Sequence, residues 1–346
     1  MPNSSATNDF VTTLDVEVPE EGKWQEVAQG IFWIRMPLPF DLNHINLYLL
    51  KDGDAFTLID TGIGTSATKD CWESLIERYN IKLKQVIVTH MHPDHIGLAG
   101  WLTERFQVPL LMTYAEYFTA RAIVAGGQGA DNWQDKVYLQ RAGFDEEYIE
   151  KNTQSKNGIR KVVSPIPLSY FRLQHDSEVK IGDDTWKVMV GRGHSPEHAC
   201  LYCESRQILI SGDHVLPQIS PNIGVYNTEP EGNTLKLYLE TLPQFLTLPQ
   251  NTLVLPSHKQ PIYGLHNRVN ELLAHHHEHL ENLLDFCQEP RNLVQCLPIL
   301  FKRELNEHNM FFAVAECLSH LNYLMYENKI KRTLENKQYR YQAIIT

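Results

Sequence analysis

The chain has 346 residues, 42% of them hydrophobic, and its 31 basic and 42 acidic residues give a formal net charge of −11. No apolar stretch is long enough to span a bilayer, and the acidic balance disfavours binding driven by nucleic-acid phosphates. The N-terminus has neither the basic region nor the apolar core of a signal peptide, and the six scattered cysteines indicate no disulfide framework. We therefore expect a soluble protein of the cytoplasm that makes no membrane contact.

Residues 1–23 are polar and acidic, and we expect them to form a loose leader. Strand-like apolar runs and helical periodicity then alternate twice along the chain. In the first half, strands are expected near 31–36, 46–50, 56–60, 86–89 and 109–112, and helices near 68–79 and 97–106. In the second half, strands are expected near 171–174, 178–181, 185–191, 199–203, 207–211 and 252–255, and a helix near 234–246. Two such halves, packed sheet on sheet with helices outside, predict an α/β fold, an αββα sandwich over residues 24–265.

A dense cluster of metal-binding side chains follows the apolar run 86–88. Residues 89–97 read Thr-His-Met-His-Pro-Asp-His-Ile-Gly and contain His90, His92, Asp94 and His95. Imidazole nitrogen and carboxylate oxygen are the ligands of zinc sites that stay open to water. One ion cannot use all four side chains well, but two adjacent ions can. The alternative, a polar turn whose histidines contact only water, is disfavoured by this spacing.

Four more candidate residues lie at the ends of predicted strands. Asp60 precedes Thr-Gly, His194 lies in Gly-Arg-Gly-His-Ser-Pro, Asp213 in Ile-Ser-Gly-Asp-His and His258 in Val-Leu-Pro-Ser-His. Loops at strand ends are where a rigid sheet presents chemical groups. Each residue alone is more typical of a solvated turn or a satisfied core histidine. Their recurrence along one chain favours a single site.

Taken in order, these five motifs resemble those of the metallo-β-lactamase superfamily, over roughly residues 28–265, and the central motif is highly specific. The resemblance implies one zinc ion held by His90, His92 and His194. It implies a second zinc ion held by Asp94, His95 and His258, with Asp213 bridging both ions. Asp60 would lie behind these ligands and orient them, as the outer partners of metal ligands do.

Asp213 also indicates a branch of the superfamily. Secreted lactamases usually have Cys at this position, whereas thioesterase, lactonase and nuclease-like members share Asp, so the chain resembles the glyoxalase II or lactonase-like branch. The third motif departs from the common His-Thr-Pro-Gly-His, because Glu197 replaces the glycine before His198. This replacement, close to the pocket, weakens any substrate assignment taken from better-known members. Glu197 and His198 in this motif, and Tyr226 in the loop after Asp213, are candidate substrate contacts, although packing of the Tyr226 ring is at least as much expected.

Two zinc ions, or iron or manganese in their place, would share a hydroxide because coordination lowers the pKa of water to about 7. The hydroxide would attack an electrophilic carbonyl or phosphoryl group, and Asp94 would accept and return a proton. The sequence thus predicts a binuclear metal-dependent hydrolase of a small-molecule ester, thioester or lactone. Sulfate esters and phosphodiesters also suit such a centre.

The segment 113–168 carries no metal motif and is predicted to be helical on both sides of a break at Gly126, Gly127 and Gly129. An insertion at this point of the chain would lie over the pocket as a lid that the glycines let move. For most of its aromatic residues we favour ordinary helix packing.

Residues 266–346 form a helical tail with a final hairpin near 329–344. Helix, helix and hairpin make a winged-helix-like pattern, similar to the C-terminal domain of the lactamase-like endoribonuclease subfamily. Within the first tail helix, His275 and His279 have i, i+4 spacing. That spacing can bind a metal, but no nearby carboxylate or thiolate supports it in the sequence, so a solvated histidine-rich face is the favoured interpretation.

The tail raises a rival hypothesis, an endoribonuclease or phosphodiesterase that binds single-stranded RNA through five basic residues: Lys329, Lys331, Arg332, Lys337 and Arg340. The net charge of −11 argues against it, because phosphate binding requires a positive surface. We expect a small-molecule substrate as the partner, without nucleic acid, and a homo-oligomer is compatible with the sequence. Steep loss of affinity with salt would identify the RNA-binding alternative.

Overall fold

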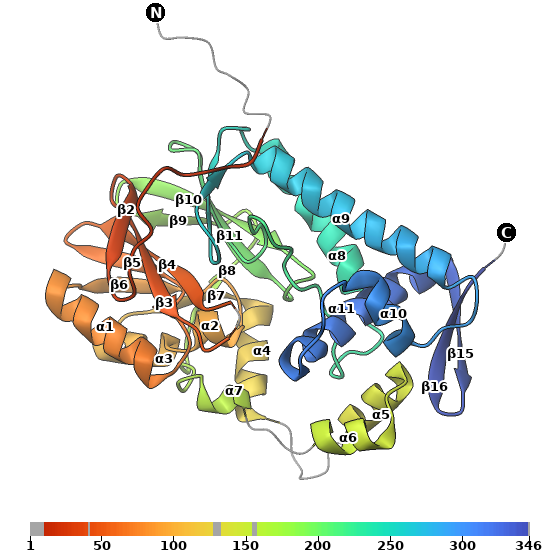
Figure 1. Cartoon of the computed structure of the whole chain (residues 1–346). Helices are drawn as coiled ribbons and strands as arrows, with labels where there is room; N and C mark the ends of the chain where they lie inside the picture. Colours follow the sequence, from red (N-terminus) through yellow and green to blue (C-terminus); the bar gives the residue numbers. More distant parts are fainter. Residues whose placement is uncertain (1–9, 41, 127–132, 154–157, 345–346) are drawn as a thin grey trace, which may run out of the picture.

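Two seven-stranded sheets face each other at the centre of the molecule, with helices on both outer faces (Figure 1). The computed structural model describes residues 10–40, 42–126, 133–153 and 158–344. The first sheet consists, in spatial order, of β2 (Trp24–Ala28), β3 (Ile31–Pro37), β4 (His44–Asp52), β5 (Ala55–Ile59), β6 (Leu83–Ile87), β7 (Leu110–Thr113) and β8 (Phe171–Leu173). The second consists of β1 (Thr12–Thr13), β14 (Ile262–Tyr263), β13 (Leu253–Pro256), β12 (Ile208–Gly212), β11 (His198–Cys203), β10 (Asp184–Gly191) and β9 (Glu178–Ile181). The predicted αββα sandwich is confirmed.

Successive side chains of a strand alternate in direction, and this divides the apolar interior into layers. On β3, Ile31 and Trp33 belong to the core between the two sheets, whereas Ile34 and Met36 belong to the core beneath the helices α1 (Ser66–Tyr79) and α3 (Ala99–Phe106). Successive side chains of a strand point to opposite faces, so a strand covered on both faces needs apolar residues at nearly every position. This is the pattern from which these strands were predicted.

Helix α1 fixes the turn that follows β5. Its first turn is capped by Thr65, whose hydroxyl accepts the backbone N–H of Thr68 at 3.3 Å. Its buried face includes Trp72, and the indole Nε1 of that residue donates to the backbone carbonyl of Thr61 at 2.9 Å. The backbone directly after Asp60 is therefore anchored from the outer layer.

Strand direction brings the predicted motifs to one edge. β5 pairs with β6 in parallel, and β12 pairs with β13 in parallel. The carboxyl ends of parallel neighbours lie at the same edge of a sheet, which is where open α/β sheets bind ligands. Asp60, His90, Asp213 and His258 all follow such strand ends.

The structure refines several predicted elements. The helix expected near 234–246 is α8 (Thr234–Thr241) followed by a 3-10 turn, η1 (Leu242–Thr247), where Pro243 supplies no backbone N–H. The segment expected to be a loose leader contributes β1, which pairs with β14. Short strands such as these are set by their partners, and their own sequences give little signal. Among the described residues, the search for a helix that is both long and apolar enough to cross a bilayer finds none.

The insertion between the second and third motifs divides between two parts of the molecule. Its helices are α4 (Tyr114–Ala125), α5 (Trp133–Ala142), α6 (Glu146–Thr153) and α7 (Gly158–Lys161). Tyr117 of α4 is buried in the core of the first sheet. Tyr138 of α5 instead donates to the carbonyl of Val225 at 2.7 Å and packs on the C-terminal core. The expected hinge glycines Gly127 and Gly129 lie outside the described residues.

The C-terminal region has the expected order of helices and hairpin. It comprises α9 (Leu265–Phe286), α10 (Leu293–Leu300), α11 (Glu307–Tyr326), β15 (Ile330–Glu335) and β16 (Gln338–Ala343), on the side of the second sheet away from the first (Figure 1). Its buried residues, such as Leu297 and Leu321, share one core cluster with Leu209 and Val254 of the second sheet. The region is therefore packed onto the sandwich along a continuous apolar interior.

Candidate metal centre

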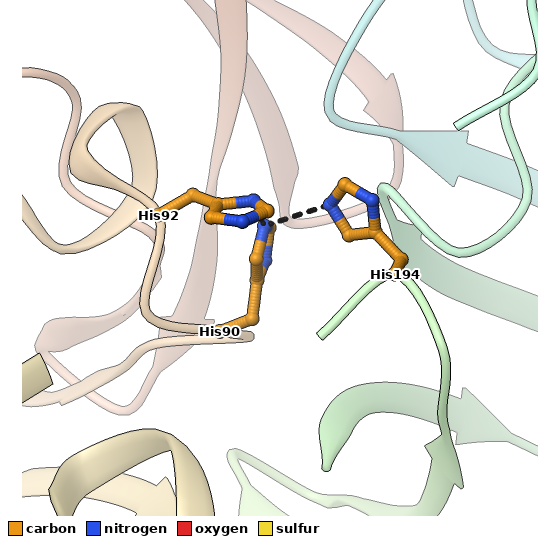
Figure 2. Close-up of side chains that lie close together, drawn as sticks. All are labelled: His90, His92 and His194. Carbon is orange, nitrogen blue, oxygen red and sulfur yellow. Dashed lines mark hydrogen bonds between the residues drawn. The ribbon is translucent and has the colours of Figure 1, made fainter. Parts of the chain in front are cut away.

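The candidate ligands predicted from the sequence lie together at the edge where the strands end. They are His90, His92, Asp94, His95, His194, Asp213 and His258. Figure 2 shows three of them pointing toward one another, His90 and His92 from the segment after β6 and His194 from the segment after β10. The short helix α2 (Pro93–Ile96) then carries Asp94 and His95 to the same place.

The three histidines of the first group direct nitrogens at a common point. His90 Nε2 lies 2.8 Å from His92 Nδ1 and 3.2 Å from His194 Nε2. His194 Nδ1 donates to the carbonyl of Asn222 at 2.8 Å, which leaves its Nε2 with a lone pair. Lone pairs that converge in this way repel unless a cation or proton lies among them. A trio of imidazoles is a common set for a zinc-type ion.

The second group consists of Asp94, His95 and His258. His95 Nδ1 donates to Asp60 Oδ2 at 2.8 Å, and His258 Nδ1 donates to the carbonyl of His44 at 2.9 Å. Both rings therefore turn Nε2 toward Asp94, at 3.7 Å and 3.5 Å from its Oδ2. Each histidine is held by its far nitrogen, as metal-binding imidazoles usually are.

Asp213 lies between the two groups. Its Oδ1 is 3.5 Å from Nε2 of both His95 and His258, and its Oδ2 is 3.6 Å from Nε2 of His194. Asp213 Oδ1 and His95 Nε2 are buried and have no hydrogen-bond partner among the described residues. Buried polar atoms without partners are costly, and a metal ion in the second group would satisfy both of these, as an ion in the first group would separate the converging nitrogens of its three histidines. The donor set therefore fits two divalent cations.

The environment sets different protonation states in the two groups. Burial, and then the nearby His194, lowers the pKa of His92 to about 3, and burial also holds the pKa of His90 and His194 below the ordinary value. These rings are neutral, which is the form that binds metal. For His258 burial acts in the same direction, but the carboxylates of Asp213 and Asp94 outweigh it and raise the pKa to about 10. A metal ion must therefore displace a proton from His258.

Asp60 lies behind the ligands and is 1% exposed. Its carboxylate accepts the backbone N–H and the hydroxyl of Thr89, each at 2.8 Å, and Nδ1 of His95 at 2.8 Å. It thus orients both the loop that enters the histidine cluster and one ring within it. These contacts agree with the orienting role that the resemblance implies.

His198 is a buried residue that holds the backbone of Asp213 in place. It is 0% exposed, and its Nε2 accepts the backbone N–H of Asp213 at 3.1 Å. Gly212 leaves room for this contact, because its φ is +52° and a Cβ there would lie 2.4 Å from the His198 ring. A substrate cannot reach a wholly buried ring, so the expected contact between His198 and substrate is replaced by a positioning role.

The other two expected substrate contacts are half-buried near the centre. Glu197 Oε2 accepts the backbone N–H of Ala115 at 3.1 Å. The Tyr226 hydroxyl donates to Asn222 Oδ1 at 2.9 Å, and its ring stacks on the exposed Phe311 with centroids 5.3 Å apart. Both side chains hold loops in place, and contact with substrate stays a prediction for them.

Glu116, at the start of α4, is a residue that the sequence reasoning missed. It is 0% exposed and accepts the Ser195 hydroxyl at 2.6 Å and the backbone N–H groups of Glu197 and Met91 at 2.7 and 2.9 Å. It therefore joins the two loops that carry the first metal group. Burial raises its pKa to about 7. The available signal was an acidic residue between two tyrosines, Tyr114 and Tyr117, in the first turn of a helix directly after a buried strand.

Comparison with known families agrees with this geometry. Residues 41–258 match the family described as Metallo-beta-lactamase superfamily, and residues 280–344 match the family described as Metallo-beta-lactamase-like, C-terminal domain. The chain belongs to the metallo-β-lactamase superfamily. The fold of this superfamily implies binding of divalent metal, and the chain has clusters of histidine and aspartate side chains that could hold it.

Individual members of the metallo-β-lactamase superfamily resemble the chain over most of its length. A β-lactamase domain protein from Burkholderia ambifaria has 38% sequence identity and a TM-score of 0.90, over 98% of this chain and 100% of that chain. The probable metallo-hydrolase YqjP of Bacillus subtilis is 26% identical over 319 residues, 88% of this chain and 94% of the relative. The human acyl-coenzyme A thioesterase MBLAC2 is 25% identical over 199 residues, 55% of this chain and 65% of the relative. The chain is thus a hydrolase of this superfamily.

Proposed function

We propose that the protein hydrolyses a small-molecule ester, thioester or lactone at two divalent metal ions. These ions are zinc, or iron or manganese in place of zinc. The observation that carries this proposal is the position of Asp213, whose two carboxylate oxygens face different ligand groups. Two ions held side by side supply a Lewis acid and an ionised water at neutral pH. The side chains of the protein carry out the proton transfers of the reaction.

Asp94 is the side chain best placed to move a proton. Its side chain is 21% exposed, compared with 10% for Asp213, so it lies on the open side of the centre. In the metal-free protein burial acts to raise its pKa, but the positive field of His95 and His258 outweighs burial and lowers the pKa to about 2, so the carboxylate is ionised. In the metal-loaded centre we assign it the role of accepting a proton. It can return that proton to the leaving group.

A covalent route through Ser195 is disfavoured. The serine hydroxyl is already donated to Glu116 at 2.6 Å, and the residue is 5% exposed. A serine nucleophile needs access to the substrate as well as a base, and the burial of Ser195 denies it that access. Ser195 therefore supports the loop of His194, and the water-based route is the one that the geometry favours.

Thioesters are the first substrate class to test. The human relative is named as an acyl-coenzyme A thioesterase, although it covers only 55% of this chain. Asp at position 213 is compatible with this choice, because thioesterase and lactonase members share it with nuclease-like members. Esters and lactones react by the same attack on an acyl carbon and are included in the proposal.

One of the five basic residues on which the RNA-binding alternative depends is already engaged, although Lys329, Lys331 and Lys337 are exposed. Arg332, a basic residue of the hairpin, forms an ion pair with Glu231 at 2.8 Å and lies over the ring of Tyr339 at 4.2 Å. An arginine engaged in this way is not free to bind phosphate. Together with the net charge of −11, this contact leads us to infer that the partner is a small molecule and that Arg332 holds the hairpin against the body of the protein.

The decisive assay compares substrate classes with one zinc-loaded preparation. Acyl thioesters, lactones and aryl esters are offered alongside a phosphodiester and a short single-stranded RNA. We expect turnover of at least one acyl substrate, its loss on chelation, and its return on addition of Zn²⁺ or Mn²⁺. Asp54→Ala, at an exposed turn position, serves as the matched control for Asp213→Ala. Cleavage of RNA alone, or acyl turnover that survives chelation, would contradict the proposal.

A further inference from the structure

A second cluster of metal-binding side chains lies away from the catalytic edge, between two C-terminal helices. His275 and His279 of α9 and Glu316 of α11 each offer one ligand atom, and these atoms lie within 4.8 Å of one another. The sequence favoured a solvated histidine face here. The structure modifies that interpretation: α11 packs against α9, so that His276 is 0% exposed while His275 and His279 are only partly exposed.

Two buried histidines, His276 of α9 and His320 of α11, hold these two helices together. His276 Nδ1 and His320 Nε2 lie 3.1 Å apart, and His320 Nδ1 donates to the backbone carbonyl of Glu316 at 2.8 Å. These contacts occupy both nitrogens of His320. They hold Glu316 opposite the pair at i, i+4 on α9, the spacing at which two side chains share one helical face.

The two histidines of the cluster are in the form that binds metal. Burial, and then the neighbouring His275 and His320, lowers the pKa of His279 to about 3, and burial likewise lowers the pKa of His275. Nδ1 of His279 is buried and has no hydrogen-bond partner among the described residues. A neutral imidazole with an unsatisfied nitrogen is a ready ligand.

Glu316 supplies the negative charge. The residue is 7% exposed, and its Oε2 accepts the Asn222 side-chain amide at 3.0 Å. A carboxylate taken out of water is costly unless a cation or several donors compensate it. Here burial raises its pKa to about 7 in the absence of a bound cation. Two imidazoles and one carboxylate are a ligand set that zinc takes in proteins.

We propose that His275, His279 and Glu316 bind one divalent transition-metal ion of the zinc type, separate from the catalytic ions. The ligand atoms of a tetrahedral zinc site lie about 3.4 Å apart, so the cluster must tighten slightly on binding. His275 and His279 are only partly buried, which leaves their side chains room to move. The ion would cross-link α9 to α11 and keep a fourth position open to water.

One residue, Asn222, connects the cluster to the catalytic edge. Asn222 donates its side-chain amide to Glu316, and its backbone carbonyl accepts Nδ1 of His194. The proposed ion would therefore lie against the loop that orients a ligand of the first catalytic group. This places it where a structural metal would stiffen the join between the C-terminal region and the sandwich.

The test is zinc content measured in the full-length protein. The protein is stripped of metal, reloaded with micromolar Zn²⁺, desalted and analysed. We expect His279→Ala and Glu316→Gln to carry about one zinc ion fewer per chain than the wild type. His277→Ala is the matched control, since His277 is exposed on the same helix and its Nδ1 donates to the backbone carbonyl of Leu273, one turn earlier. It should keep the wild-type content.

Two further arms separate this inference from the proposed catalytic centre. Asp213→Ala removes the catalytic ions and should still lose about one more zinc ion per chain when His279→Ala is added. His275→Ala, at a half-exposed position, repeats the test if His279→Ala does not fold as judged by circular dichroism. Equal zinc content in the wild type, His279→Ala, His275→Ala and Glu316→Gln, or a difference seen only at millimolar zinc, would overturn the site.

Discussion

Asp213 is the residue on which both catalytic groups depend. One oxygen of its carboxylate faces each group, whereas His258 is a member of the second group. We predict that Asp213→Ala loses both catalytic ions and that His258→Ala loses mainly one. Metal analysis of the two variants beside the wild type checks this. Retention of both catalytic ions in Asp213→Ala would refute the bridging role.

The protonation of the second group predicts how metal binding depends on pH. The pKa of His258 is raised to about 10, and that of His95 is raised too because its neighbouring carboxylates outweigh burial. Both rings are therefore protonated in the metal-free protein at pH 7 and must lose a proton to bind. Zinc affinity should rise at least about tenfold for each pH unit between about pH 6 and pH 9.

Isothermal titration in two buffers with different ionisation enthalpies measures the protons released as zinc binds. Release of at least about one proton per second-group ion is expected at pH 7. Affinity that stays constant across this pH range would contradict the assignment of His95 and His258 as protonated ligands in the metal-free state.

At the scale of elements, Glu116 ties helix α4 to the two loops of the first group. Replacing it with Ala removes the acceptor for three donors, which should lower the free energy of unfolding by roughly 2–4 kcal/mol. Metal affinity at the first group should fall as well, because both loops lose a common anchor.

Glu116→Gln should lie between the wild type and Glu116→Ala, since an amide keeps one acceptor oxygen and can satisfy the two donors on the Oε1 side. Glu104→Ala, at an exposed position on α3, is the control. Denaturant unfolding and zinc titration report the two effects separately. If Glu116→Ala matched Glu104→Ala in both measurements, the anchoring role would be excluded.

The elements also show which features a sequence can predict. Strands such as β3, β4, β10 and β11 are buried on both faces, so their apolar runs identify them directly. The metal ligands were predictable because each follows such a strand. β2 and β14 lack this signal, because the first is an edge strand and the second has two residues.

Contacts between residues far apart in the chain could not be predicted from the sequence. Glu316 meets the histidines of α9 only because α11 folds back across that helix, and nothing within residues 275–279 indicates this partner. Glu116 likewise gains its role from loops that approach it in the folded chain. His198 was expected to face substrate because of its place in the motif, whereas its position on β11 buries it.

For the whole molecule, the shared interior predicts cooperative unfolding. The core that contains Leu209 and Val254 of the second sheet continues into Leu297 and Leu321 of the C-terminal helices without a break. We therefore predict one thermal transition for the metal-loaded protein, seen alike by calorimetry and by circular dichroism. Two resolved transitions would mean that the C-terminal region unfolds as an independent domain.

The central claim is that Asp213 joins two metal ions at the catalytic edge. Crystals of the zinc-loaded protein, measured at wavelengths on both sides of the zinc absorption edge, test it directly through anomalous scattering. Two peaks about 3.5–4 Å apart are predicted, one among His90, His92 and His194 and the other among Asp94, His95 and His258, with one oxygen of Asp213 on each. A single peak at this edge, or two peaks that Asp213 does not bridge, would contradict the account.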